Sequence, residues 1–271
     1  MGIDQLAIVL STHPAQFSAV AYKGEIATNL TKIAGWGYQG VELAIRDPAL
    51  VGVDKLCQVL KASGLCVPAI GTGQAWGEER LSFTSDEREV RWAAIERIKS
   101  HLPLAESLDA MVIIGLIRGV TSPGQTHSRA MEYLVEGLRE CLEAAKSRRV
   151  KFALEPINRY ETDLINSTAE GLELIDRLKS EQIGLLLDTF HMNIEELAIE
   201  TSIRSCGERI FHFHVADSNR MCPGTGHLDF KSIFGALSAT GYPGWISGEF
   251  MPGPDPDAAA QACIAFLHDL Y

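Results

Sequence analysis

Short apolar runs alternate along the whole chain with longer segments of helical spacing. The apolar runs predict eight strands, over residues 3–10, 40–43, 65–70, 110–114, 151–155, 185–188, 209–215 and 245–249. The segments between them predict eight helices, over about 25–34, 53–62, 85–104, 126–146, 168–178, 194–205, 230–239 and 256–270. Ser85 and Ser167 are expected to cap the third and fifth of these helices, and residues 71–74 are expected to form a loop.

Eight strand–helix pairs in about 250 residues are the count and size of a (β/α)8 barrel. We therefore predict an α/β fold, a TIM barrel that forms a single domain over residues 1–271. The competing fold is a doubly wound sheet, which binds dinucleotides through a GxGxxG motif after its first strand. Here that position holds Ser11, Thr12, His13 and Pro14 instead.

The clearest strand is the run Leu185–Leu187, which ends at Asp188 and is followed at once by Thr189, His191 and Asn193. Such a run is typical of a buried parallel strand that delivers a carboxylate to its end. A buried carboxylate needs a partner, because burying an unpaired charge is costly. The ends of the other strands are where that partner is expected.

Four strand ends carry acidic or imidazole side chains. Reading the chain in order gives Glu155, Asp188, His214 and Glu249, each about one strand–helix repeat after the last. Alternation along the strand places His212 and His214 toward the barrel axis, and Phe211, Phe213 and Val215 toward the helices. Because barrel enzymes carry their active site at the carboxyl ends of the strands, we expect the four side chains to converge there.

Three carboxylates and one imidazole make a hard, mostly oxygen donor set. Such a set favours Mn2+, with Mg2+ or Co2+ as alternatives, over metals that prefer thiolates. Three carboxylates a few ångströms apart would raise one another's pKa without a cation between them. The predicted metal ligands are therefore Glu155, Asp188, His214 and Glu249.

Composition and charge limit the classes of molecule that the protein is expected to bind. The formal net charge is −11, which disfavours nucleic acid and anionic membrane surfaces as partners. No signal peptide and no apolar run of 18 residues is found, and the six cysteines form no CxxC pair. We expect a cytoplasmic protein with reduced thiols, which acts on a small molecule and forms a homo-oligomer, a dimer or a tetramer.

The motifs 154-LEPINRYE-161, 188-DTFHMN-193 and 212-HFHVADSNR-220 resemble the ketose 3-epimerases of the xylose isomerase-like barrel superfamily. The earlier stretches VELAIRDPALV, AIGTGQA and VIIGLIRG look most like a branch that acts on keto-sugar acids, the 5-keto-L-gluconate epimerases. The resemblance implies a metal-dependent sugar epimerase, with Glu155 and Glu249 as both ligands and catalytic carboxylates. One would remove a proton beside the ketone and the other would return one to the opposite face of a cis-enediolate.

The resemblance also assigns substrate contacts. His191 and Arg220 match residues that polarise substrate oxygens, and Glu161 matches one that binds the substrate near C1. Gly71 and Gly115 end the third and fourth strands and are expected to form the pocket wall, although bare turns would explain them almost as well. Two further residues, Arg46 and Arg118, follow the second and fourth strands in loops expected to open on the active-site face.

An arginine pair there would suit the carboxylate of a sugar acid such as 5-keto-L-gluconate. The alternative is that Arg46 pairs with Asp47 or Glu42 and that Arg118 is a solvated charge. The loop Gly224–His227 could approach substrate or hold phosphate, but a plain turn is the simpler interpretation.

Three other functions use the same scaffold. An aldose–ketose isomerase, such as hydroxypyruvate isomerase, needs the same groups and differs in which carbon loses its proton. A zinc-dependent apurinic endonuclease needs extra histidines at the ends of strands two to four, where this chain has Glu42, Gly71 and Gly115. A non-catalytic sugar-binding protein would not need two opposed glutamates.

Overall fold

The computed structural model of the protein describes residues 5–270. Within these residues nine strands lie in one sheet in the order β2-β1-β3-β4-β5-β6-β7-β8-β9, and a pairing between β1 and β9 closes it. Every pairing is parallel. Eight strands form the barrel, and β2 pairs only with the last two residues of β1. The predicted (β/α)8 barrel is confirmed.

The strands are short and mostly buried. Their bounds are Leu6–Ser11 (β1), Tyr22–Lys23 (β2), Gly40–Ala44 (β3), Ala69–Gly71 (β4), Met111–Ile114 (β5), Phe152–Leu154 (β6), Ile183–Asp188 (β7), Ile210–Val215 (β8) and Ile246–Gly248 (β9). The helices are Ile26–Gly35 (α1), Val53–Ser63 (α2), Gln74–Glu79 (α3), Arg88–Leu108 (α4), His127–Ala145 (α5), Thr168–Leu178 (α6), Thr189–Glu195 (α7), Ile199–Cys206 (α8), Phe230–Ala239 (α9) and Pro256–Asp269 (α10).

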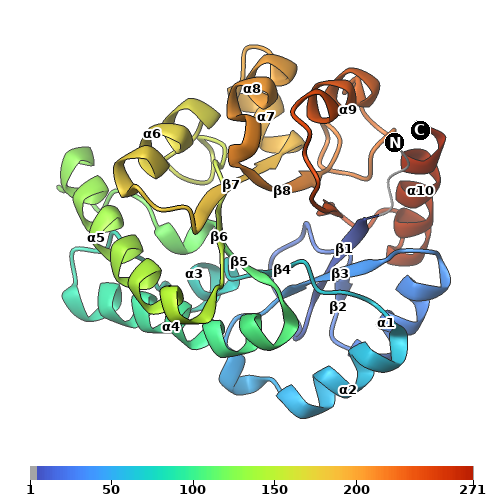
Figure 1. Cartoon of the computed structure of the whole chain (residues 1–271), viewed down its shortest axis with the longest axis horizontal. Coiled ribbons are helices and arrows are strands. Elements are labelled where there is room, and N and C mark those ends of the chain that lie inside the picture. The colour runs from blue at the N-terminus through green and yellow to red at the C-terminus, as the bar shows by residue number, and fades with distance from the viewer. Residues whose placement is uncertain (1–4, 271) are drawn as a thin grey trace.

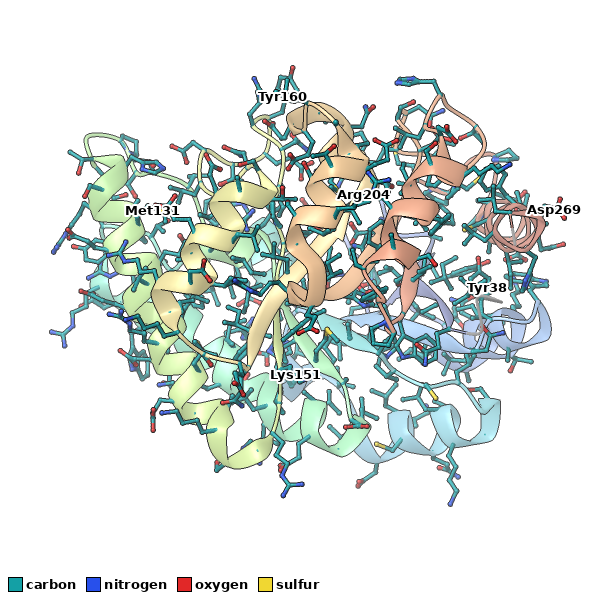
Figure 2. All side chains as sticks on the ribbon, turned by 45° about the horizontal axis from the view of Figure 1, so that its top comes forward. Tyr38, Met131, Lys151, Tyr160, Arg204 and Asp269 are labelled. Carbon is teal, nitrogen blue, oxygen red and sulfur yellow. The ribbon has the colours of Figure 1, made fainter. Side chains whose placement is uncertain are left out.

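The helices surround the strands, as the ring of coils in Figure 1 shows. Alternate residues of each strand point outward and pack with the helices in one large core, for example Phe213 and Val215 of β8. The inward residues Ala69, Ile113, Ala153 and Leu186 form a separate small apolar cluster inside the barrel. In Figure 2 Lys151, just before β6, and Tyr160, just beyond it, lie at opposite ends of the barrel, which gives the direction of the strands.

A bulge between β7 and β8 corrects one prediction of facing. Leu185 pairs with Ile210, whereas Leu186 pairs with His212, so Phe211 is an extra residue in β8. Phe211 therefore packs against the cluster inside the barrel rather than under the helices. Gly184 leaves room for it, since a Cβ there would lie 2.3 Å from the Phe211 ring. His212 and His214 face inward as predicted.

Two helix predictions and one loop prediction need correction. The single helix expected over 194–205 is replaced by two helices, α7 and α8, because the backbone is extended at Glu196 and Ala198 between them. Asp188 caps α7 immediately after β7 and accepts the Phe190 N–H at 2.8 Å. The loop expected at 71–74 leads directly into the short helix α3. Ser85 does not cap α4, which begins at Arg88, whereas Ser167 forms the predicted capping box at α6.

Strand predictions are right in position and less so in length. The strand expected over 65–70 is reduced to β4, because Pro68 has no N–H to donate and residue Cys66 forms only an isolated bridge with Gly40. The start of the first predicted strand, residues 3–4, lies outside the described residues. No helix within residues 5–270 is both long and apolar enough to span a bilayer.

Candidate active site and metal centre

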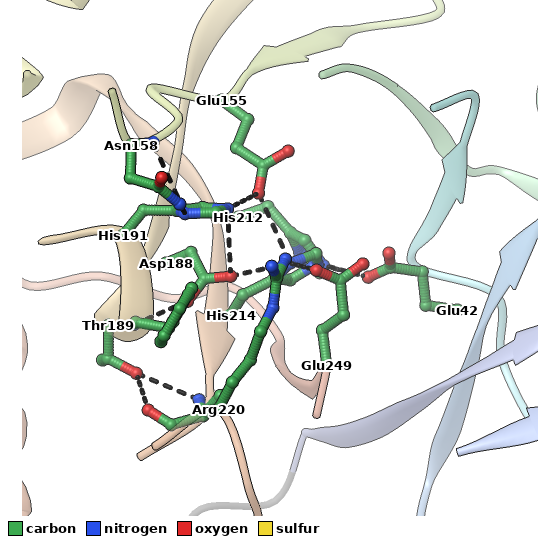
Figure 3. A network of polar contacts seen from close by, with 12 residues as sticks. Glu42, Glu155, Asn158, Asp188, Thr189, His191, His212, His214, Arg220 and Glu249 are labelled. Atoms are coloured by element: carbon green, nitrogen blue, oxygen red, sulfur yellow. Dashed lines mark hydrogen bonds and ion pairs between the residues drawn. The ribbon is translucent and has the colours of Figure 1, made fainter. Parts of the chain in front are cut away.

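The four predicted ligands meet at the carboxyl ends of neighbouring strands. Glu155 follows β6, Asp188 ends β7, His214 lies in β8 and Glu249 follows β9. One donor atom of each lies within 4.8 Å of the donor atoms of the other three. The His214 Nδ1 atom is 4.0 Å from Glu155 Oε1, 4.0 Å from Asp188 Oδ2 and 3.7 Å from Glu249 Oε2. Figure 3 shows the carboxylates turned toward this imidazole.

The electrostatics of the cluster call for a cation. Burial, reinforced by the Glu249 carboxylate, raises the pKa of Glu155 well above its usual range. Burial also raises the pKa of Asp188 to about 6. Although burial opposes its charged form, the Glu42 and Glu249 carboxylates raise the pKa of His214 well above the ordinary value. A divalent cation between these groups would relieve the repulsion between the carboxylates that contributes to these raised pKa values.

Buried polar atoms without a partner support a metal in the cluster. Glu155 Oε1 and His214 Nδ1 are both buried and make no hydrogen bond. Buried polar atoms are normally hydrogen-bonded, so orphaned atoms of this kind call for an unfilled partner. An oxygen-rich set with one imidazole nitrogen fits a hard divalent ion. The residues that would hold it are Glu155, Asp188, His214 and Glu249.

A second buried group adjoins the first through His214. The Glu42 Oε2 atom lies 2.8 Å from His212 Nε2 and 2.9 Å from His214 Nε2. Although burial would raise the pKa of Glu42, the two imidazoles hold it below its ordinary value. Glu42 was expected to be no more than a strand end or a partner of Arg46. Its position between Val41 and Leu43 in a buried strand was the available signal, because such a carboxylate must be paired.

A cavity of about 290 Å³ opens above the metal cluster. Gly71 and Gly115 line it, as predicted, and so do the apolar side chains Phe17, Val20 and Ile113. Gly115 approaches the cluster closely, since a Cβ there would lie 2.8 Å from Glu155 Oε2. A Cβ at Gly71 would meet nothing nearer than 3.8 Å. Helix α3 contributes Gln74 and Glu78 to the same wall, which the sequence did not reveal.

Two predicted substrate residues, Arg220 and Glu161, lie together at one side of the cavity. Arg220 Nη1 donates to Glu161 Oε1 at 2.7 Å, and its guanidinium stacks on the rings of Phe17 and Phe190 at 5.1 and 4.6 Å. The Arg220 backbone has a φ of 61°, which a loop must stabilise by other contacts. The pair presents one charged donor and one acceptor to the cavity.

His191 is fixed by a hydrogen bond on its far side. The Asn158 side-chain amide lies 2.7 Å from His191 Nδ1 and donates to it, which leaves the proton on Nε2. His191 Nε2 then points at Glu155 Oε1 and Asp188 Oδ2, 3.7 and 3.9 Å away. Burial and the nearby Arg220 charge lower the pKa of His191 well below its ordinary value. The ring is therefore a neutral donor beside the cluster.

The two arginines expected to bind a substrate carboxylate do not line the cavity. Arg46 turns toward α3 and forms ion pairs with Glu78 and Glu79 at 2.5 and 3.2 Å, rather than with Asp47 or Glu42. Arg118 is fully buried and donates to the backbone carbonyl of Glu155, so it is not a solvated charge either. Both loops start on the expected face, but the Arg46 side chain lies against α3 and the Arg118 side chain is buried.

The loop after β8 is folded around Asp217. The Asp217 carboxylate accepts the N–H groups of Ser218, Gly224 and Leu228 at 2.7, 2.9 and 3.2 Å. A Cβ at Gly226 would lie 2.2 Å from Asp217 Oδ1. The glycines thus wrap a carboxylate of the chain itself, so the phosphate interpretation of this loop has no support. The Asp217 N–H also donates to the Met221 carbonyl, and the Arg220 N–H donates to the Asp217 carbonyl.

The chain is similar to sugar epimerases over most of its length. Residues 30–270 match the family model described as xylose isomerase-like TIM barrel. An L-ribulose 3-epimerase of Mesorhizobium japonicum is 32% identical over 89% of this chain and 80% of its own. A probable ketose 3-epimerase of Synechocystis sp. is 38% identical over 84% of this chain and 79% of its own.

Solved structures give the same fold. The D-allulose 3-epimerase from Methylomonas sp., in complex with D-allulose, superposes with a TM-score of 0.85 at 24% identity. The match covers 100% of this chain and 98% of that one. At this identity the likeness concerns the barrel alone. The sequence matches carry the family relationship.

Proposed function

The chain belongs to the xylose isomerase-like TIM barrel family, and from this premise we propose that it is a divalent-metal-dependent ketose 3-epimerase. The single observation that carries the proposal is the pair Glu155 and Glu249, whose carboxylates lie 4.0 and 3.7 Å from the His214 Nδ1 atom. They directly follow β6 and β9, with β7 and β8 between them, and so approach the cavity from two directions. Epimerisation beside a ketone needs a base on one face of the carbon and an acid on the other.

The residues of the chain divide the work. A divalent cation in the cluster, with Mn2+ proposed first and Mg2+ or Co2+ as alternatives, would polarise the ketone and make the neighbouring C–H more acidic. One glutamate accepts that proton and the other delivers a proton to the opposite face, which inverts the carbon. His191 Nε2–H donates to a substrate oxygen, and the Arg220–Glu161 pair binds a hydroxyl group.

We propose a neutral ketose, such as L-ribulose or D-psicose, as the substrate class. Arg220 is the guanidinium that lines the cavity, and Glu161 already neutralises it at 2.7 Å. Arg46 and Arg118 are directed elsewhere, so a substrate carboxylate would meet several glutamates and no free arginine among the lining residues of the described chain. This argument weighs against 5-keto-L-gluconate, which the arginine loops had suggested.

Deuterium exchange tests the reaction and its position. The protein with Mn2+ is incubated in D2O with L-ribulose, D-psicose, D-tagatose, 5-keto-L-gluconate and hydroxypyruvate, and exchange is followed by NMR. We expect deuterium at C3 of a neutral ketose and the appearance of its C3 epimer. Exchange confined to C1 and C2 with formation of an aldose would replace the epimerase by an isomerase.

Metal removal is the matched control. EDTA should abolish exchange, and Mn2+ or Co2+ should restore it. Full activity in a sample shown to be metal-free would contradict the proposal. A homo-oligomer and a cytoplasmic location stay predictions from the sequence.

A further inference from the structure

Glu42 connects two parts of the barrel that are not neighbours in the sheet. It lies on β3, which pairs with β1 and β4, whereas His212 and His214 lie on β8, which pairs with β7 and β9. Glu42 is 1% exposed, and a single oxygen of its carboxylate contacts both imidazoles. Figure 3 shows this carboxylate approaching the two rings from the side opposite Asp188 and His191.

The contact decides which nitrogen of each ring carries hydrogen. An ionised carboxylate only accepts, so both Nε2 atoms must donate to Glu42 Oε2. In a neutral His214 this leaves the lone pair on Nδ1. Nδ1 is the atom that faces the Glu155, Asp188 and Glu249 carboxylates at 3.7 to 4.0 Å. The opposite tautomer would place a hydrogen where a metal ion must bind.

We propose that Glu42 is a positioning residue that fixes the ring and tautomer of His214 and thereby presets the metal centre. The inference rests on the proposed metal-dependent function. His212 completes the arrangement, because it holds the same Glu42 oxygen from a second direction and limits its movement. Carboxylates that accept from the outer nitrogen of a ligand histidine orient the ring and increase its basicity.

If Glu42 had a purely structural role, its replacement would leave the metal affinity unchanged. Buried ion pairs contribute little to stability compared with well-packed apolar residues of similar volume. The core histidine His101 shows that this chain can satisfy a buried imidazole without a carboxylate, since its two nitrogens lie 2.8 and 3.0 Å from the backbone carbonyls of Arg97 and Ile45. His214 differs from it in having one nitrogen held and the other left open.

Metal affinity and tautomer are the two readouts. Mn2+ affinity is measured by calorimetry on metal-free wild type, Glu42→Met, Glu42→Gln and Glu78→Gln. Glu78→Gln is the control, since it removes one negative charge from the same cavity wall without touching an imidazole. We expect Glu42→Met to raise the Kd for Mn2+ about 10- to 100-fold. Glu42→Gln keeps an accepting oxygen and should give a smaller increase, and Glu78→Gln should stay within about twofold.

Histidine NMR of the 15N-labelled, metal-free protein reports the tautomer at a pH where the His214 ring is neutral, because a metal ion on Nδ1 would fix the hydrogen on Nε2 in every variant. Wild type and Glu42→Gln should show His214 with hydrogen on Nε2, and Glu42→Met should lose that signal or show both tautomers. The inference is overturned if Glu42→Met binds Mn2+ as tightly as wild type with the Nε2–H tautomer retained. That result would leave the proposed epimerase intact, whereas a wild type that binds no divalent ion would overturn both.

Folding failure of the methionine variant still leaves a decision. In that case Glu42→Gln and Glu78→Gln, which differ in position but not in the change made, are compared alone. An affinity loss at least threefold larger for Glu42→Gln than for Glu78→Gln supports the positioning role of Glu42. Equal effects at the two positions would mean that only the charge of the cavity matters, and the inference falls.

Discussion

The two halves of the barrel differ in what they bring to the cavity. The ligand half, β6 to β9, supplies Glu155, Asp188, His214 and Glu249, and its loops add His191 and Arg220. The wall half, β1 to β5, supplies mainly glycine and apolar side chains, such as Gly71 and Gly115. Its arginines are turned away into ion pairs or buried positions. Glu42 is the exception, a wall-half carboxylate that acts on the ligand half.

This difference suggests that the reacting groups and the shape of the substrate cavity come from different halves of the barrel. The ligand half holds the groups that we propose bind a cation and move protons, whereas the wall half determines what fits beside them. Changes in the ligand half should therefore affect turnover, and changes in the wall half should act through space and position. The predictions below test this division, from the largest expected effect to the smallest.

The largest effects are expected in the ligand half. Glu155→Gln and Glu249→Gln should each lower kcat by at least about 10²- to 10⁴-fold, since each removes a positioned acid–base group and a metal-binding charge. Steady-state rates with the best neutral ketose, and circular dichroism for the fold, measure this. Near wild-type turnover in a folded variant of either residue would rule out the two-glutamate mechanism.

A single position in the wall half should approach that sensitivity. Gly115→Ala would place a Cβ 2.8 Å from Glu155 Oε2 and displace this carboxylate. A misplacement of this size lowers kcat by about 10- to 100-fold. Gly71→Ala is the matched control, because its Cβ would meet nothing nearer than 3.8 Å, and its kcat should change by less than about twofold. Equal rates for the two variants would contradict the close contact.

Metal affinity should fall in acid because of the ligand half alone. Burial raises the pKa of Asp188 to about 6, and burial with the Glu249 carboxylate raises that of Glu155 further above its usual range. These two carboxyl groups must lose their protons to bind a cation, and so must the His214 imidazole, whose pKa the Glu42 and Glu249 carboxylates raise against the effect of burial. Affinity is therefore complete above these pKa values and is lost as the pH falls through them.

Below pH 6 the Kd for Mn2+ should rise about tenfold per pH unit for each proton displaced. Calorimetric titrations between pH 5 and 8 measure this dependence. The Glu42 carboxyl group adds no proton of its own to this dependence, because its two imidazole partners hold its pKa low. A Kd that stays constant from pH 7 to pH 5 would show that the carboxyl groups are already ionised without metal.

The smallest effect is expected at Arg46. Its ion pairs with Glu78 and Glu79 are partly exposed, and such pairs contribute about 0–1 kcal/mol to stability. Arg46→Met should leave kcat/KM for a neutral ketose within about twofold. The ratio of kcat/KM between 5-keto-L-gluconate and that ketose should also be unchanged. A selective loss for the sugar acid would return Arg46 to the substrate site.

The convergence of the four candidate ligands could be predicted from the sequence because a barrel places successive strand ends side by side. Asp188 and His214 needed only their position in an apolar strand and the alternation of that strand. Helix α3 was missed because its six residues are too few to show helical spacing. The direction of the Arg46 and Arg118 side chains could not be derived, since a loop's starting point does not fix where it turns.

Glu42 illustrates a second limit. Its burial between apolar neighbours showed that it needed a partner, but the partners lie 170 and 172 residues away. Local pattern indicates the need for a contact and not its identity. The specific motifs all lie after residue 153, in the ligand half, so they gave no information about Glu42 in the wall half.

The bulge in β8 has a consequence for how this chain can change in length. Phe211 is the extra residue that lets both its ring and the His212 imidazole turn toward the barrel interior. Removing one residue from this strand would turn either the ring or the imidazoles to the opposite face. Deletions here should therefore eliminate activity even where the barrel still closes, and viable insertions and deletions should be found in the loops. The length of this strand is therefore expected to be preserved together with its two histidines.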